Sequence, residues 1–86
     1  MNQDLDKAKI LLKLLRKGNW NDSYDQSEYF KRFENLDGLI KELKTIGWVI
    51  LHKKPKFEAY SLSTEHKKEI IDFIEALISE VQGTIR

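Results

Sequence analysis

Apolar residues recur at helical spacing in several stretches of the chain, and each such stretch predicts an amphipathic helix. The first helix is predicted from about Leu5 to Lys17, and Gly18 suits the left-handed position just past its end. A later helix begins around Asn35, a good N-terminal cap, and stops at Gly47. Its apolar stripe comprises Leu36, Leu39, Ile40, Leu43 and Ile46.

A short helix is predicted between these two. Ser23 and Gln26 have the Ser-x-x-Gln spacing of a capping box, and Asp25 to Glu28 offers a second register for the same start. Aromatic residues then supply one face of this helix, which is expected to end near Glu34. These aromatic residues are Tyr29, Phe30 and Phe33.

The period of the pattern changes between residues 48 and 62. Trp48 to Leu51 is a short β-prone run, and Glu58 to Leu62 alternates between polar and apolar residues. Pro55 lies between the two runs, where it fixes its own backbone and favours an extended residue before it, as a turn requires. The pattern therefore predicts a β-hairpin whose tip carries Lys53, Lys54 and Lys56.

The last helix is predicted from Ser63 or Thr64 to about Gln82 or beyond, and it is the most apolar segment of the chain. Its apolar arc covers roughly 160° at 100° per residue, which is more than one stripe. One strip can face the protein's own hairpin and first helix: Ile70, Phe73 and Leu77. The other strip has the three- and four-residue steps of a coiled-coil seam: Ile71, Ile74, Ile78, Val81 and Ile85.

A chain of 86 residues forms one domain with a modest core. Such a core is expected to offer too little surface to cover both strips of the last helix. The seam therefore predicts a homodimer in which the C-terminal helices of two copies pair in an antiparallel arrangement.

Composition narrows the classes of function. The chain has no cysteine, which excludes disulfides and thiolate metal sites, and His52 and His66 lack the spacing of a metal site. No cofactor is expected. Phosphate-binding loops and nucleophile motifs are also missing from the sequence, so an enzyme is not expected. The first residues do not resemble a secretory signal and no run approaches a membrane span, which predicts a cytoplasmic protein without a membrane partner.

The net charge of the chain is only +1, but it is unevenly distributed. Residues 1–57 carry twelve Lys and Arg against eight Asp and Glu, a net charge of +4. Residues 58–86 carry three against six, a net charge of −3. This asymmetry favours one face that meets a polyanion and another face with a different role.

The order helix, helix, helix, hairpin, helix resembles the winged helix-turn-helix superfamily, specifically small bacterial and archaeal regulators of the MarR and PadR type. The residues that carry the resemblance are the leucine-rich helix from Leu36, the Gly47-Trp48 step, the basic hairpin and the Leu62-Ser63 step. The resemblance implies a mainly α fold with a three-helix core, a two-stranded wing and a long C-terminal helix. It divides the chain into a DNA-binding domain over residues 1–63 and a dimerisation helix, packed on that domain, over residues 64–86.

In that family the helix that matches residues 35–46 enters the major groove, and the wing touches the backbone or the minor groove. The resemblance implies base contacts by Lys41 and Thr45, and a close backbone approach at Gly38. Asp37 and Glu42 lie on the same reading face, which has no arginine. The remaining residues expected to contact DNA, mostly at phosphates, are Lys31, Arg32, Asn35, Lys44, Lys53, Lys54 and Lys56.

The expected function is therefore sequence-selective binding of double-stranded DNA by a homodimer, as in transcriptional regulation. Two alternatives stay open. The domain is then either a winged helix that docks on another protein within a larger assembly, or an architectural or replication-associated DNA-binding protein.

Overall fold

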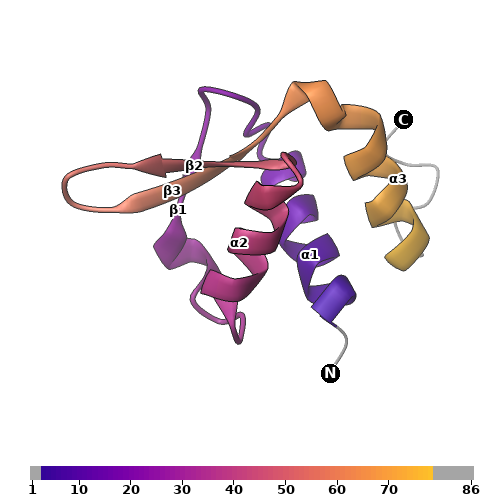
Figure 1. The fold of residues 1–86 in the computed structure, drawn as a ribbon, viewed down its shortest axis with the longest axis horizontal. Coiled ribbons are helices and arrows are strands. Elements are labelled where there is room, and N and C mark those ends of the chain that lie inside the picture. Colours follow the sequence, from indigo (N-terminus) through magenta and orange to yellow (C-terminus); the bar gives the residue numbers. More distant parts are fainter. Residues whose placement is uncertain (1–2, 79–86) are drawn as a thin grey trace.

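The computed structural model describes residues 3–78. Within this range the chain forms three α-helices and a three-stranded antiparallel sheet, so the fold is a small mixed α and β domain (Figure 1). Two 3₁₀ turns, η1 and η2, complete it. The elements in chain order are α1 (Gln3–Arg16), β1 (Asp25–Gln26), η1 (Ser27–Phe30), α2 (Leu36–Thr45), β2 (Val49–Lys53), β3 (Glu58–Leu62), η2 (Thr64–His66) and α3 (Lys67–Leu77).

The predicted hairpin is confirmed, and it belongs to a larger sheet. Strands β2 and β3 pair from Val49 opposite Leu62 to Lys53 opposite Glu58. The Lys54 amide donates to the Phe57 carbonyl over 2.9 Å and closes the turn. Strand β1 pairs with the free edge of β3, so β3 lies in the middle of the sheet. The hairpin projects well beyond the helices (Figure 1).

The hydrophobic core is centred on α1, which lies between α2 and α3 (Figure 1). Because the apolar residues of α1 recur every three or four positions, they form one continuous buried face. The sheet and η1 cover the end of this face. The largest side chains with essentially no exposure are Ile10, Leu11, Leu14, Phe30, Leu39, Leu43, Leu62, Ile70 and Ile74.

The helix predicted from Ser23 to Glu34 is wrong. Only one 3₁₀ turn forms there, and the two residues before it join the sheet as β1. The Ser23 hydroxyl donates to the Asn19 side chain at 3.4 Å instead of capping a helix. Pairing of the Asp25 backbone with Tyr60 satisfies groups that a helix would have used, because every buried backbone group needs a partner.

The last helix is shorter than predicted. It ends at Leu77, and Ile78 has extended backbone angles (φ −123°, ψ 92°) where a helix was expected to continue to Gln82 or beyond. Val81 and Ile85 of the predicted seam lie outside the described residues.

The domain buries the described part of the seam strip of α3. The described seam residues Ile71, Ile74 and Ile78 are 9%, 0% and 8% exposed within the single chain. For these three residues the expectation that so small a core leaves the strip uncovered is therefore wrong. Phe73 and Leu77, assigned to the inner strip, are only partly buried against the core.

One residue of the α2 stripe also departs from its prediction. Ile46, just past the end of α2, is 51% exposed, whereas Leu39 and Leu43 are each 1% exposed. The chain turns away from the helix directly afterwards, since Gly47 has a φ of 84° that favours glycine. Ile46 is therefore an apolar side chain on the surface.

Candidate nucleic-acid interface

The outward face of α2 carries the side chains predicted to read bases. Leu39, Ile40 and Leu43 are buried on the opposite face, which leaves Lys41, Lys44 and Thr45 exposed. The Thr45 hydroxyl donates to the Lys41 carbonyl over 2.8 Å, so its proton is used within the helix. Thr45 can still accept a hydrogen bond from a base amino group.

Asn35 and Gly38 fit each other at the start of α2. Asn35 has a left-handed backbone (φ 55°) and makes no side-chain cap, although its carbonyl accepts from the Leu39 amide over 3.0 Å. A Cβ atom on Gly38 would lie 2.7 Å from the Asn35 side chain. The absence of a side chain at Gly38 thus makes room for Asn35, an internal role that the sequence did not suggest.

The two carboxylates of α2 have different environments. Glu42 pairs with Lys7 of α1, with 3.3 Å between the ammonium nitrogen and the carboxylate oxygen. This ion pair links α2 to α1 and neutralises one of the two negative charges expected on the reading face. Asp37 instead lies on the side of α2 that faces the hairpin.

A hollow of about 290 Å³ is lined by residues of α2 and of the hairpin. Tyr60 lies in it, and burial raises the pKa of its phenol above the ordinary value. The negative charges of Glu58 and Asp37 raise this pKa further, and a hydrogen bond with the Ser27 side chain lowers it. The charged lining of this hollow thus comprises two carboxylates, those of Glu58 and Asp37, and two lysines, Lys41 and Lys44.

The tip of the hairpin presents Lys53, Lys54 and Lys56 to solvent, in agreement with the sequence. The Lys54 ammonium lies 5.2 Å from the centre of the Tyr24 ring, within cation–π range. Tyr24 also packs on His52 and Phe57, with ring centres 4.8 and 6.3 Å away.

A chain of hydrogen bonds anchors this aromatic cluster. The Ser61 hydroxyl donates its only proton to the Asn21 carbonyl over 2.7 Å. His52 Nε2, 2.9 Å from the Ser61 oxygen, must therefore donate the second bond. The cluster braces the hairpin from the side opposite α2. Sequence reasoning missed it because the pattern places Tyr24 in a helix, whereas in the sheet Tyr24 adjoins β1.

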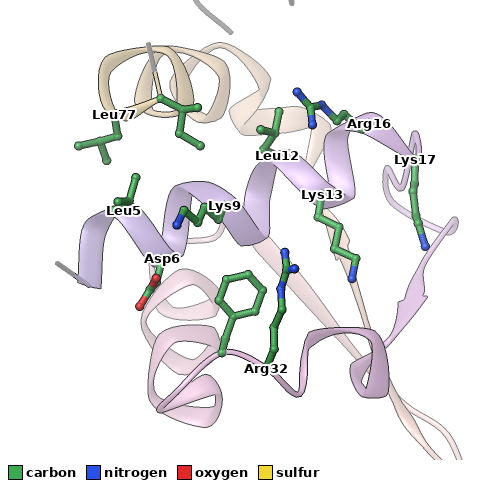
Figure 2. A pocket seen from close by; sticks show the side chains of 11 residues that line it. Leu5, Asp6, Lys9, Leu12, Lys13, Arg16, Lys17, Arg32 and Leu77 are labelled. Atoms are coloured by element: carbon green, nitrogen blue, oxygen red, sulfur yellow. The ribbon is translucent and has the colours of Figure 1, made fainter. Parts of the chain in front are cut away.

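Two further residues expected to contact DNA, Lys31 and Arg32, lie apart from the surface formed by α2 and the hairpin tip. Lys31 is exposed just after η1. Arg32 stacks on Phe33, 5.1 Å from the ring centre, and extends toward α1 (Figure 2). There it borders an open groove of about 1040 Å³ together with Lys9, Lys13, Arg16 and Lys17.

No metal or membrane site emerges from residues 3–78. No three His, Asp or Glu side chains of this range gather in a way that would hold a metal ion. No helix of the same range is long and apolar enough to cross a membrane.

Comparison with protein-family models, with curated proteins and with solved structures finds no match for this chain. Its function must therefore be inferred from its own residues and their arrangement.

Proposed function

We propose that this protein is a winged helix that binds double-stranded DNA, with α2 in the major groove and the β2–β3 hairpin as a wing on the backbone, and that it acts as a transcriptional regulator. One observation carries the proposal. The exposed face of α2, with Lys41, Lys44 and Thr45, lies beside a projecting hairpin whose tip exposes three further lysines. This is the pairing of reading helix and basic wing that duplex recognition by such domains uses.

Charge on the α2 face supports the same function. In the Lys7–Glu42 ion pair, the lysine offsets one of two negative charges that would repel phosphates. Two exposed lysines then remain on α2 against Asp37. Base contacts by Lys41 and Thr45 would supply sequence preference, and the wing lysines would supply affinity for any sequence.

The proposal does not depend on a homodimer. The described part of the predicted seam lies inside the domain, so it offers no apolar surface to a second α3. Pairing through Val81 and Ile85 stays a prediction for residues outside the described range.

Replacing Lys53, Lys54 and Lys56 together by Ala tests the wing. Affinity for every duplex should fall, and the slope of log K against log salt concentration should flatten by about 0.9 for each lysine that pairs with a phosphate in the unmutated complex. Lys68→Ala is the matched control, because this side chain on α3 is 83% exposed and far from the wing in the fold (Figure 1). Unchanged affinity and slope in the triple variant would exclude binding of the wing to DNA.

Lys41→Ala tests the reading helix separately. Binding to the preferred site, found by selection from a random duplex pool, should weaken by about 1–3 kcal/mol while non-specific binding is nearly retained. An equal loss on random DNA would make Lys41 a phosphate contact instead.

A second candidate function is docking on another protein through α2, and Ile46 favours it. This side chain is 51% exposed and borders a hollow of about 370 Å³ together with Lys7, Lys41 and Thr45. Under this alternative the unmutated protein would not bind duplex DNA even at low salt. A gel-shift titration of the unmutated chain therefore separates the two functions.

A further inference from the structure

The α1 groove, the 1040 Å³ hollow described above, gathers cations from separate segments of the chain. Its charged lining comprises five Lys and Arg side chains against one carboxylate, that of Asp6. Figure 2 shows Lys9, Lys13 and Arg16 along α1, with Arg32 reaching toward them from the segment before α2. The remaining lining is apolar: Leu5, Leu12, Phe33, Leu77 and Ile78.

Two of the five cations are engaged within the domain. Lys17 forms an ion pair with Asp25 at 2.9 Å and lies 4.8 Å from the centre of the Tyr29 ring. Lys13 donates to the Tyr29 carbonyl and lies 4.8 Å from the centre of the Phe30 ring. These contacts hold η1 against α1 and build one wall of the groove.

The other three cations have no carboxylate partner among the described residues, although Arg32 stacks on the Phe33 ring. Among residues 3–78 no ion pair is formed by Lys9, Arg16 or Arg32. Lys9 and Arg16 are separated by seven residues, which is two helical turns or about 10.5 Å along α1. Carboxylates spaced by two turns of a neighbouring helix would match this separation.

The groove lies on a different side of the molecule from the DNA surface proposed above. Lys7, which meets Glu42 of α2, is about 160–180° around α1 from Lys9 and Arg16 at 100° per residue. A duplex seated on α2 and the wing therefore leaves the groove free.

We propose that the α1 groove is a docking site for an acidic amphipathic helix of a partner protein. Carboxylates of that helix pair with Lys9, Arg16 and Arg32, and its apolar side chains cover Leu5 and Leu77, which are only half-buried. Duplex DNA matches the charge but offers nothing apolar to these leucines. A second copy matches less well, since the exposed side of α3 carries Lys67 and Lys68 beside its acidic residues. The docking site does not rest on the proposed DNA binding.

A displayed library of random peptides about 16 residues long, slightly longer than α1, tests this site on the full chain. Selection uses the unmutated protein, with counter-selection on the variant Lys9→Glu/Arg16→Glu/Arg32→Glu. The expected winners are acidic and place apolar residues at helical spacing. Their affinity should fall roughly tenfold or more in this variant, and by less than about twofold in Lys68→Glu.

Circular dichroism melts verify that each variant is folded, and Lys9→Gln/Arg16→Gln/Arg32→Gln replaces the charge reversal if that variant does not fold. Three results would overturn the site. The first is a failure to enrich any peptide on the unmutated chain over the variant, or enrichment of peptides that are not acidic. The second is a loss of duplex affinity in the glutamine variant as large as its loss of peptide affinity, which would assign the groove to DNA. The third is self-association of the unmutated chain, seen by sedimentation and abolished in that variant, which would assign it to a second copy.

Discussion

Helices α2 and α3 have 10 and 11 residues and both are amphipathic, yet the domain surrounds them to very different degrees. In α2 the buried stripe is narrow, and Lys41, Lys44 and Thr45 occupy the free side. In α3 the fully buried Ile70 and Ile74 are flanked by Ile71 and Ile78, at 9% and 8% exposure. The comparison shows that a helix can have a wide apolar arc because its own domain surrounds it on several sides. Such an arc does not by itself require a second chain.

The neighbours of α3 explain this enclosure. It packs along α1, and the Trp48 ring before β2 meets Phe73 edge-on with centres 5.3 Å apart. The chain passes from β3 through η2 directly into α3, and α1 lies along the inner side of this helix (Figure 1). The free side of α2 has no such cover, which makes it available to a ligand.

Ile74→Asp should have the largest effect of these substitutions on the stability of the fold. The substitution places an unpaired carboxylate at a position that is 0% exposed, at a cost of several kcal/mol. Since small domains have about 5–15 kcal/mol of stability in total, much of the protein should unfold. Circular dichroism and amide NMR spectra measure this loss directly. A well-folded variant would mean instead that the domain does not enclose Ile74.

A matched pair of alanine substitutions gives the next largest effect. Ile70→Ala removes a side chain that is 0% exposed and should cost about 2–5 kcal/mol of unfolding free energy. Ile46→Ala removes one that is 51% exposed and should change it by less than about 0.5 kcal/mol. Urea titrations give both values. Similar losses at the two positions would contradict the difference between α3 and the end of α2.

The sequence predicted the parts of the fold whose pattern is local. Helices α1 and α2 and the hairpin follow from apolar spacing, Gly18, Gly47 and Pro55. The strand at Asp25 and Gln26 could not be predicted in this way, because its partner β3 lies more than thirty residues away along the chain. The capping-box spacing at Ser23 is a local signal that this long-range pairing overrides.

The candidate site divides in the same manner. Lys53, Lys54 and Lys56 are neighbours along the chain, so their cluster is visible in the sequence itself. The α1 groove is not, because Arg32 joins Lys9 and Arg16 only when η1 folds against α1. The pairing of Glu42 with Lys7 is hidden for the same reason.

Asp37→Asn tests whether the exposed side of α2 binds DNA, and its expected effect on affinity is smaller. Asp37 lies near Lys41 and Lys44, where a phosphate would approach. Removing its charge should strengthen duplex binding about fivefold, which corresponds to about 1 kcal/mol for a close charge pair in water. Fluorescence anisotropy at two salt concentrations measures the gain. Glu69→Gln on α3 is the control, and an equal gain there would show only a change in overall charge.

The smallest expected effect is on the pH dependence of stability. It tests the hollow beside α2, in which Tyr60 lies, and has no counterpart in the apolar surroundings of α3. Burial, followed by the charges of Glu58 and Asp37, raises the pKa of Tyr60 above its ordinary value of 10.0. The folded state therefore holds this proton more tightly than the unfolded chain does. Its contribution to stability is complete below pH 10 and is lost as the pH rises from there through the folded pKa. Urea titrations from about pH 9 upward should show a steeper alkaline loss in the unmutated chain than in Tyr60→Phe, which cannot ionise. Because Phe also removes the hydrogen bond with Ser27, its stability should be lower at about pH 7, so the slopes are compared and not the absolute values. Equal slopes in the two proteins would mean that neither burial nor the nearby carboxylates raise the pKa of Tyr60 in the folded protein.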